Sequence, residues 1–263
     1  MLLAIDVGNT QTVIGLFGDD ADAHPDDALV EHWRVSTQAA RTADEYRLIL
    51  QELLHLGRFT FAEHVTGVVV SSVVPRVTAA LRGMSERYLG AAAVVIGPGT
   101  RTGMPILYRN PNEVGADRVA DAVGAFDLYG GPVVVVDFGT ATTVDAVSAK
   151  GEYLGGAIVP GIEVSMEALF ERAAGLRRVE LVEPRELIGR STADSILSGA
   201  VYGFAAMVDG LCTRFVQELG AATVVGTGGI APFILPYTST VEHHEPWLTL
   251  HGLRVVWSRN QPS

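Results

Sequence analysis

The sequence contains a single cysteine, Cys212, among its 263 residues. An intramolecular disulfide needs two cysteines, and a metal site built from several cysteine ligands needs more than one. The sequence therefore excludes both, and it favours a protein of the reducing cytoplasm. Cys212 itself lies within the apolar periodicity of residues 201–215, where a small core residue is expected.

Basic residues are also scarce. Nineteen lysines and arginines stand against thirty acidic residues, which gives a formal net charge of −11. A negative chain is not attracted over long range to nucleic acid or to anionic membranes. We therefore expect neither nucleic acid nor a membrane as a partner, and an anionic substrate must be held by local donors.

Several kinds of segment are missing. The first residues, MLLAIDVGNT, include no basic leader, and no apolar stretch approaches the ~20 residues of a membrane span. The phosphate-binding pattern G-x-x-x-x-G-K-[ST] is missing as well. We expect a soluble, unprocessed, cytoplasmic protein, and any phosphate binding must use another kind of loop.

Glycine, by contrast, is abundant, with 29 residues, many of them between short runs rich in valine and isoleucine. Tight turns between buried strands produce this pattern, which predicts an α/β protein. The predicted strands cover residues 2–6, 12–17, 29–36, 67–71, 93–96, 133–137, 142–148, 153–158 and 223–225. Helical spacing of apolar residues predicts helices over 43–56, 75–89, 116–129, 163–173 and 192–219, whereas 248–257 is ambiguous.

The most informative feature is an internal repeat. LLAIDVGNTQTVIGLF at residues 2–17 aligns without a gap with VVVVDFGTATTVDAVS at 133–148. Each copy consists of an apolar strand, a D-x-G turn and a second apolar strand, which indicates a hairpin with a carboxylate at its tip. The repeat predicts two similar lobes, 1–114 and 115–263, each with a mixed sheet. The acidic segment 18–27 is expected to be an exposed hairpin tip.

The first copy has the residues of a phosphate-binding hairpin. Gly8 lets the backbone approach a phosphate closely, the amides and side chains of Asn9, Thr10 and Thr12 can donate to its oxygens, and Asp6 can hold Mg²⁺ directly or through water. An ordinary turn in which the aspartate caps its own backbone would give the same local pattern.

The second copy adds another carboxylate, Asp137, and another hydroxyl, Thr140. Two facing acidic hairpins suit a polyphosphate bridged by cations in a cleft between the lobes. A third glycine-rich turn, at 226–229, precedes the segment 230–235, whose helix start could accept an adenosine or its phosphates.

The motifs stand in a specific order along nearly the whole chain: DVGNT at 6–10, NPNEVGADR at 110–118, DFGTATTVD at 137–145, GGAIVPG at 155–161 and GTGG at 226–229. This series resembles that of the type III pantothenate kinases. The resemblance implies the fold of the acetate kinase, sugar kinase, Hsp70 and actin superfamily, with duplicated ribonuclease H-like (actin-like ATPase) domains. It also implies ATP-dependent phosphorylation of the primary hydroxyl of pantothenate, the first step towards coenzyme A, by a homodimer that needs Mg²⁺ and K⁺ or NH₄⁺.

Matched position by position, the resemblance assigns roles to single residues. Asp117 is the proton acceptor, since a carboxylate there can take the proton of the substrate hydroxyl as its oxygen attacks the γ-phosphorus. Asp137 is the ligand of the monovalent cation, and Asp6 belongs to the Mg²⁺ site. The ATP contacts are Asp6, Val7, Gly8, Asn9, Thr10, Gln11, Thr12, Val13 and Thr140. The pantothenate contacts are Tyr108, Gly115, Ala116, Asp117, Arg118 and Thr192, the last from the neighbouring subunit.

The residues alone leave other interpretations open. Asp117 could serve only to stabilise a helix N-terminus through the macrodipole. A kinase of another small alcohol or carboxylate, or a non-catalytic nucleotide-binding regulator, would use the same fold. An active kinase is favoured by the intact residues Gly8, Asn9, Asp117, Arg118 and Asp137. Arg177 and Arg178 are interpreted as solvated, and His243 and His244 as part of a loop.

Overall fold

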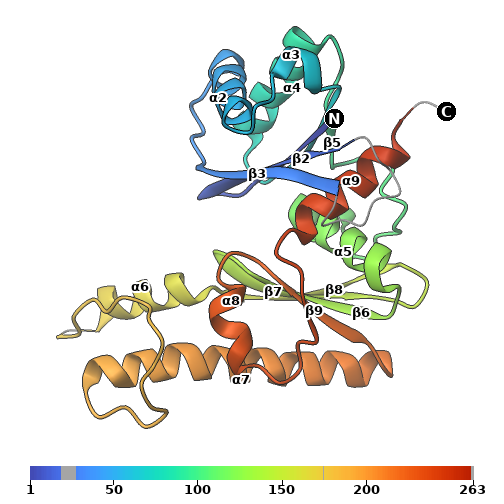
Figure 1. The fold of residues 1–263 in the computed structure, drawn as a ribbon. Helices are drawn as coiled ribbons and strands as arrows, with labels where there is room; N and C mark the ends of the chain where they lie inside the picture. Colours follow the sequence, from blue (N-terminus) through green and yellow to red (C-terminus); the bar gives the residue numbers. More distant parts are fainter. Residues whose placement is uncertain (19–27, 174, 262–263) are drawn as a thin grey trace. The chain divides into compact units, whose positions relative to one another are not determined.

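The computed structural model describes residues 1–18, 28–173 and 175–261, so most of the predicted hairpin tip at 18–27 lies outside the described residues. The chain divides into two compact units (Figure 1). Unit 1 consists of Met1–Asp127 and Leu248–Ser263, and unit 2 consists of Leu128–Trp247. The division differs from the predicted boundary after residue 114, because the first turns of the helix that follows, and the C-terminal helix, pack within unit 1.

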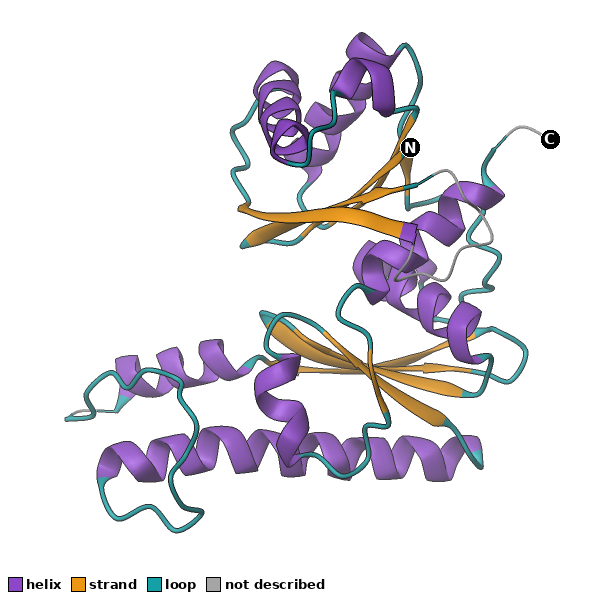
Figure 2. Cartoon of the chain, viewed as in Figure 1, coloured by secondary structure: helices purple, strands orange, loops and turns teal. Residues whose placement is uncertain are grey.

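The sheet of unit 1 has the strand order β3-β2-β1-β4-β5. Its first three strands form an antiparallel meander, and β1, β4 and β5 run parallel (Figure 2). The strands are β1 (Leu2–Val7), β2 (Gln11–Phe17), β3 (Leu29–Ser36), β4 (Gly67–Ser72) and β5 (Val94–Val95). The helices of this unit are α2 (Ala43–Leu56), α3 (Phe61–His64), α4 (Pro75–Leu89), α5 (Ala116–Tyr129, shared at its end with unit 2) and α9 (Leu248–Arg259).

Successive side chains along each strand point to opposite faces of this sheet. Leu3, Ile5 and Val7 point to the core that α2 and α4 cover. Asp6 therefore points to the opposite face, where α9 packs on β1 and β4. The two glycines Gly124 of α5 and Gly252 of α9 let these helices touch, because an added Cβ at Gly252 would collide with the carbonyl of Ala120.

Unit 2 repeats the plan of unit 1. Its strand order, β10-β9-β6-β7-β8, again joins an antiparallel meander to parallel strands. The strands are β6 (Val133–Phe138), β7 (Ala141–Val147), β8 (Tyr153–Pro160), β9 (Thr223–Thr227) and β10 (His243–His244), and the helices are α6 (Ile162–Arg172), α7 (Thr192–Leu219) and α8 (Ala231–Ile234). The same topology in both units confirms the predicted duplication.

The gap-free alignment of the two hairpins is wrong by one residue in the second strand. Asp6 pairs with Val13 across its hairpin, whereas Asp137 pairs with Thr143. The second hairpin therefore has a turn one residue shorter, and Thr143 corresponds in structure to Val13. The sequence could not reveal this, because β7 carries threonines at both 142 and 143, and either can be aligned with Thr12 of β2.

Helix α7 covers the core face of the second sheet with Val201, Ala205 and Val208. Cys212 is buried in the same core, and burial raises the pKa of its thiol to about 11, as befits a packing residue. The expectation that no apolar stretch has the length of a membrane span is wrong for α7, which is long and apolar enough by length and composition. That finding is weak, since the core helices of globular proteins pass the same test.

Candidate active site

The first hairpin ends in an exposed tip of Asn9, Thr10 and Gln11. The N–H of Gly8 donates to the carbonyl of Gln11 at 3.0 Å and closes the turn. Because the tip side chains are exposed and the turn is tight, backbone and side-chain donors of these residues are available to an anionic ligand.

Thr37, which sequence reasoning missed, supports this hairpin. Its hydroxyl donates to the carbonyl of Gly8 at 2.8 Å, and its N–H donates to the carbonyl of Thr10 at 2.9 Å. The hydroxyls of Thr12 and Thr37 are also 2.8 Å apart. Since Thr37 gives its only hydroxyl proton to Gly8, Thr12 must donate to Thr37. The hydroxyl of the buried Thr12 is thus used in a hydrogen bond that supports the hairpin from within. The role of Thr12 as an ATP contact stays a prediction.

Asp6 is held between Val13 on β2 and Ser71 on β4, its register partners in the sheet. Its Oδ1 atom is buried and has no hydrogen-bond partner within the described part of the chain. Burial, and next the charge of Asp117, raise the pKa of Asp6 to about 7, while Ser71 acts in the opposite direction. A carboxylate in such a place is the kind of group that a bound cation would stabilise.

The motif NPNEVGADR forms a short 3₁₀ turn, η1 (Pro111–Glu113), that leads into α5. Asn110 holds this turn, because its Oδ1 accepts from the N–H of Asn112 at 3.3 Å and its Nδ2 donates to Glu113 at 2.9 Å. These hydrogen bonds from Asn110 fix the backbone just before the predicted substrate residues.

Gly115 and Asp117 fit each other at the start of α5. An added Cβ at residue 115 would collide with Oδ1 of Asp117, so glycine lets this carboxylate keep its position. The same Oδ1 accepts the N–H of Arg118 at 2.8 Å. Asp117 is partly exposed and Arg118 is buried. Two predicted site residues, Asp6 and Asp117, also interact electrostatically within unit 1, because the charge of Asp117 helps to raise the pKa of Asp6.

The second hairpin is fixed by Gly161, which begins α6. The N–H of Gly161 donates to the carbonyl of Thr140 at 3.0 Å, and an added Cβ there would collide with the backbone of Gly139 and Thr140. This close approach explains the final glycine of the motif GGAIVPG. Thr140 itself is exposed at the turn, as expected of a nucleotide contact.

Asp137 stands between two threonines, Thr143 on β7 and Thr227 on β9, both buried. Gly228, at φ +99°, packs against this carboxylate, and an added Cβ there would collide with Oδ1. Asp137 is thus flanked by two threonines, and a glycine keeps the space beside its carboxylate free of a side chain.

The remaining predicted residues lie at separate places. Tyr108 is half-buried in the loop before η1 of unit 1. Thr192 is exposed in the first turn of α7 in unit 2, next to Ser191, whose Oγ accepts the N–H of Asp194 at 3.1 Å. Among the described residues no group of three or more histidine, cysteine or acidic side chains could hold a metal ion.

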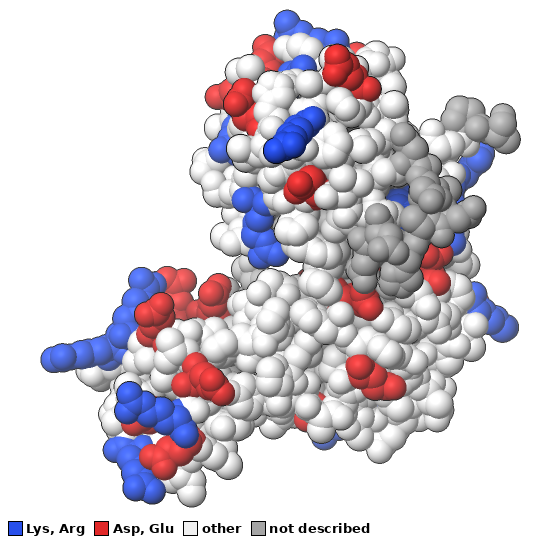
Figure 3. Space-filling model, viewed as in Figure 1, with Lys and Arg blue, Asp and Glu red and all other residues white. Residues whose placement is uncertain are grey.

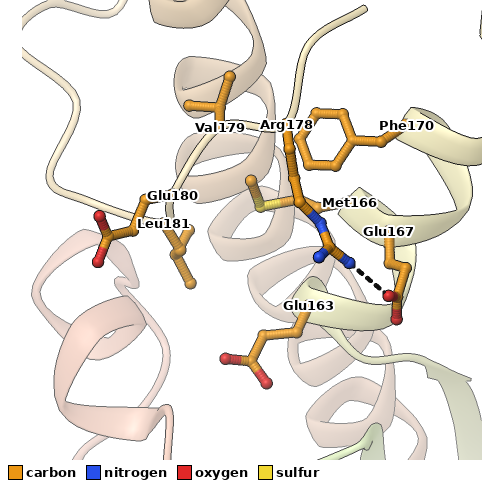
Figure 4. Close-up of a pocket in the computed structure, with 8 residues that line it drawn as sticks. All are labelled: Glu163, Met166, Glu167, Phe170, Arg178, Val179, Glu180 and Leu181. Carbon is orange, nitrogen blue, oxygen red and sulfur yellow. Dashed lines mark hydrogen bonds and ion pairs between the residues drawn. The ribbon is translucent and has the colours of Figure 1, made fainter.

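A cavity of about 500 Å³ lies elsewhere in unit 2, between α6 and residues 178–181 (Figure 4). Arg178 reaches across it to Glu167 at 2.6 Å, so this arginine is paired as well as solvated. Three glutamates and one arginine make the cavity unsuited to an anion, and it contains no predicted site residue. On the face drawn in Figure 3, acidic and basic side chains are interspersed.

The chain was compared with known proteins. Residues 2–214 match the profile of the type III pantothenate kinase family. A type III pantothenate kinase of Streptomyces avermitilis is 52% identical over 99% of this chain and 98% of its own length, and one of Moorella thermoacetica is 52% identical over 99% and 100%.

Solved structures match at lower identity. A Campylobacter jejuni protein assigned to the Baf family of transcriptional activators is 17% identical with a TM-score of 0.61, and covers 98% of each chain. The ethanolamine utilization protein EutJ of Carboxydothermus hydrogenoformans is 13% identical with a TM-score of 0.55, over 97% of this chain and 89% of its own. These likenesses concern the fold alone, whereas the match in sequence is decisive: the chain belongs to the type III pantothenate kinase family.

Proposed function

We propose that this chain transfers the γ-phosphoryl group of ATP to the primary hydroxyl of pantothenate, giving 4'-phosphopantothenate, the first step of coenzyme A biosynthesis. Membership of the type III pantothenate kinase family, at about half identity over the full length, is the observation that carries the proposal. The electrostatics of unit 1 support it, because the charge of Asp117 contributes to the raised pKa of Asp6.

Asp117 is the proposed proton acceptor. It sits in the first turn of α5 on a backbone fixed by Asn110, and Gly115 leaves its carboxylate free of steric conflict. In the reaction it takes the proton of the pantothenate hydroxyl while that oxygen forms its bond to the γ-phosphorus and the bond to ADP breaks. Arg118, with Tyr108, Gly115 and Ala116, positions pantothenate.

The first hairpin is the proposed phosphate site. Residues Asp6 to Val13, together with Thr140 of the second hairpin, contact ATP. The backbone amides of the tip donate to phosphate oxygens, and the Thr37 network keeps that tip in one conformation.

Two cations fit the residues present. The buried, unpaired Oδ1 of Asp6 suits Mg²⁺, which takes its other ligands from phosphates and water and neutralises phosphate charge. Asp137, between two threonine hydroxyls and beside a glycine, suits K⁺ or NH₄⁺. Both assignments are proposals from the chemistry of the donors.

We further propose a cytoplasmic homodimer in which Thr192 contacts the pantothenate of the neighbouring subunit. Exposed large apolar side chains support a partner surface in unit 2, where Ile158 on β8 and Ile188 before α7 are 61% and 80% exposed. Nucleic acid and membrane are not proposed as partners. Sedimentation at working concentration tests the dimer, and a fully active monomer would contradict it.

An ATP-consumption assay tests the activity. ATP should be consumed with pantothenate, Mg²⁺ and K⁺, and the rate should fall sharply without pantothenate. A panel of other small alcohols and carboxylates tests the alternative substrate. If one of these were used and pantothenate were not, the substrate assignment would be wrong; no consumption with any of them would favour a nucleotide-binding regulator.

A further inference from the structure

The two hairpins differ at the position opposite the aspartate. Asp6 faces the apolar Val13 across its hairpin, whereas Asp137 faces the hydroxyl of Thr143. The difference arises from the shorter turn of the second hairpin. Register partners on one face of an antiparallel pair have Cβ atoms about 4.5–5.5 Å apart, so Thr143 and Asp137 stand side by side.

The hydroxyl of Thr143 has a defined orientation. It donates its proton to Oδ2 of Asp145, at 3.1 Å, on the same face of β7. Asp145 is held in turn by the hydroxyl of Tyr153, which donates to Oδ1 at 2.7 Å. All three side chains are buried, at 8%, 1% and 0% exposure.

A threonine hydroxyl has one proton and two lone pairs. Since the proton of Thr143 is committed to Asp145, the hydroxyl can offer only its lone pairs to anything else in contact with it. A buried oxygen that can accept but cannot donate is suited to a cation. In K⁺ channels, for example, the ion is coordinated by uncharged carbonyl oxygens that replace its hydration shell.

We propose that Thr143 is a second protein ligand of the monovalent cation at Asp137, and that Asp145 is a positioning residue that turns its lone pairs to the ion. The inference rests on the proposed cation role of Asp137. It predicts that the site combines one carboxylate with at least one uncharged hydroxyl oxygen, whereas the equivalent place beside Asp6 offers none from β2.

Cation binding can be measured without turnover. An ion that binds the folded state raises its unfolding temperature as the ion concentration increases. The full-length protein with saturating MgADP is titrated with K⁺ in place of tetramethylammonium at constant ionic strength. The concentration of K⁺ that gives half of the rise in Tm is compared between the parent and single variants.

Thr143→Val removes the hydroxyl at nearly constant volume, and should raise the half-saturating K⁺ concentration about 10-fold or more. Thr143→Ser keeps the hydroxyl and should stay within about 3-fold of the parent. Tyr153→Phe is the matched control, because it also removes one donor from Asp145 but leaves the oxygen of Thr143 in place; it should again stay within about 3-fold. Thr143→Ala replaces the valine variant if that one does not fold.

The outcomes separate the two proposals. Asp137→Asn should abolish the response to K⁺, and if it titrates like the parent, the proposed cation role of Asp137 fails. If the Tm of Asp137→Asn does not respond to K⁺ but Thr143→Val has the half-saturating K⁺ concentration of the parent, Thr143 is not a ligand. Only this inference then fails. If Tyr153→Phe weakens K⁺ binding as much as Thr143→Val, the loss reflects general disturbance of the buried cluster and not removal of the Thr143 oxygen, and the hydroxyl ligand is likewise overturned.

Discussion

The charge of Asp117, in the first turn of α5, helps to raise the pKa of Asp6 at the end of β1 to about 7, although burial of Asp6 is the larger cause. Two predicted functional carboxylates thus influence each other inside one unit of the fold. Neither the 111 positions that separate them in sequence nor their different secondary structures suggested that they would lie near one another.

Asp6 should titrate near pH 7 in the protein without nucleotide or metal, and Asp117→Asn should lower its pKa part of the way towards 3.8. The shift is partial because burial remains. Carboxyl ¹³C NMR of Asp6 measures it, with the exposed Asp44→Asn as the control that leaves Asp6 unchanged. An unaltered pKa in Asp117→Asn would show that the two charges do not interact.

The raised pKa of Asp6 also makes the free energy of unfolding depend on pH. The folded state binds the proton of Asp6 more tightly than the unfolded state does, so this contribution is complete below about pH 4 and is lost as the pH rises to about 7. Asp6→Asn should lose that part of the pH dependence. Urea unfolding of the parent and the variant at pH 5 and pH 8 measures it, and parallel changes in both would contradict the assignment.

Asp117→Asn should still bind ATP and pantothenate while turnover falls on the order of 10²–10⁴-fold, because the base is removed and the size is kept. We expect the lower end of this range, since phosphoryl transfer depends chiefly on positioning and charge neutralisation. Steady-state kinetics gives the rate and calorimetry gives the affinities. Turnover within about twofold of the parent, with normal binding, would remove Asp117 as the base.

Thr37→Val should weaken ATP binding more than pantothenate binding, because the carbonyl of Gly8 and the hydroxyl of Thr12 both lose their partner. An increase of about 10-fold in the KM for ATP corresponds to the loss of one or two buried hydrogen bonds. Thr37→Ser keeps the hydroxyl and is the control. Equal rises in both KM values would point to general damage rather than to the hairpin.

Gly252→Ala should destabilise the protein by about 2–4 kcal/mol, because its Cβ would meet the carbonyl of Ala120 and force α9 away from α5. Gly83→Ala is the matched control in α4 of the same unit. Its added Cβ would lie at an ordinary 3.8 Å from Ala43, and alanine should stabilise that helix by about 0.5–1 kcal/mol. Urea unfolding compares the two, and similar values would refute the proposed close contact.

Much of the fold could be predicted from the sequence because its signals are local. Valine-rich runs bounded by glycine gave strands such as β6, and helical spacing gave α7, whose predicted and observed bounds agree at Thr192–Leu219. The C-terminal residues were ambiguous because α9 is buried on several sides, which removes the polar face that periodicity relies on. Two-residue strands such as β10, at the predicted loop His243–His244, are too short to leave a pattern.

The site was less accessible to sequence reasoning. Motif residues such as Asp6, Gly115 and Asp137 are where the predictions put them along the chain. Their supporting residues, Thr37 and Thr143 among them, could not be found, because hydrogen bonds and strand register depend on pairings between distant or offset segments. A one-residue difference in turn length changes which side chain faces Asp137, and no alignment by similarity detects it.

Unit 1 is completed by the C-terminal helix α9, and this affects the order in which the two units fold during synthesis. The sheet face around Gly15 and Gly67 is covered by Leu250 and Trp257, which are synthesised only after unit 2. The 120 residues of unit 2 come first, and at about 5–20 residues per second they take roughly 6–24 s to make. During that interval the N-terminal sheet exposes an apolar surface to which chaperones can bind. Unit 2 is a continuous segment and can fold in the meantime. The order of folding is therefore expected to reverse the order of synthesis.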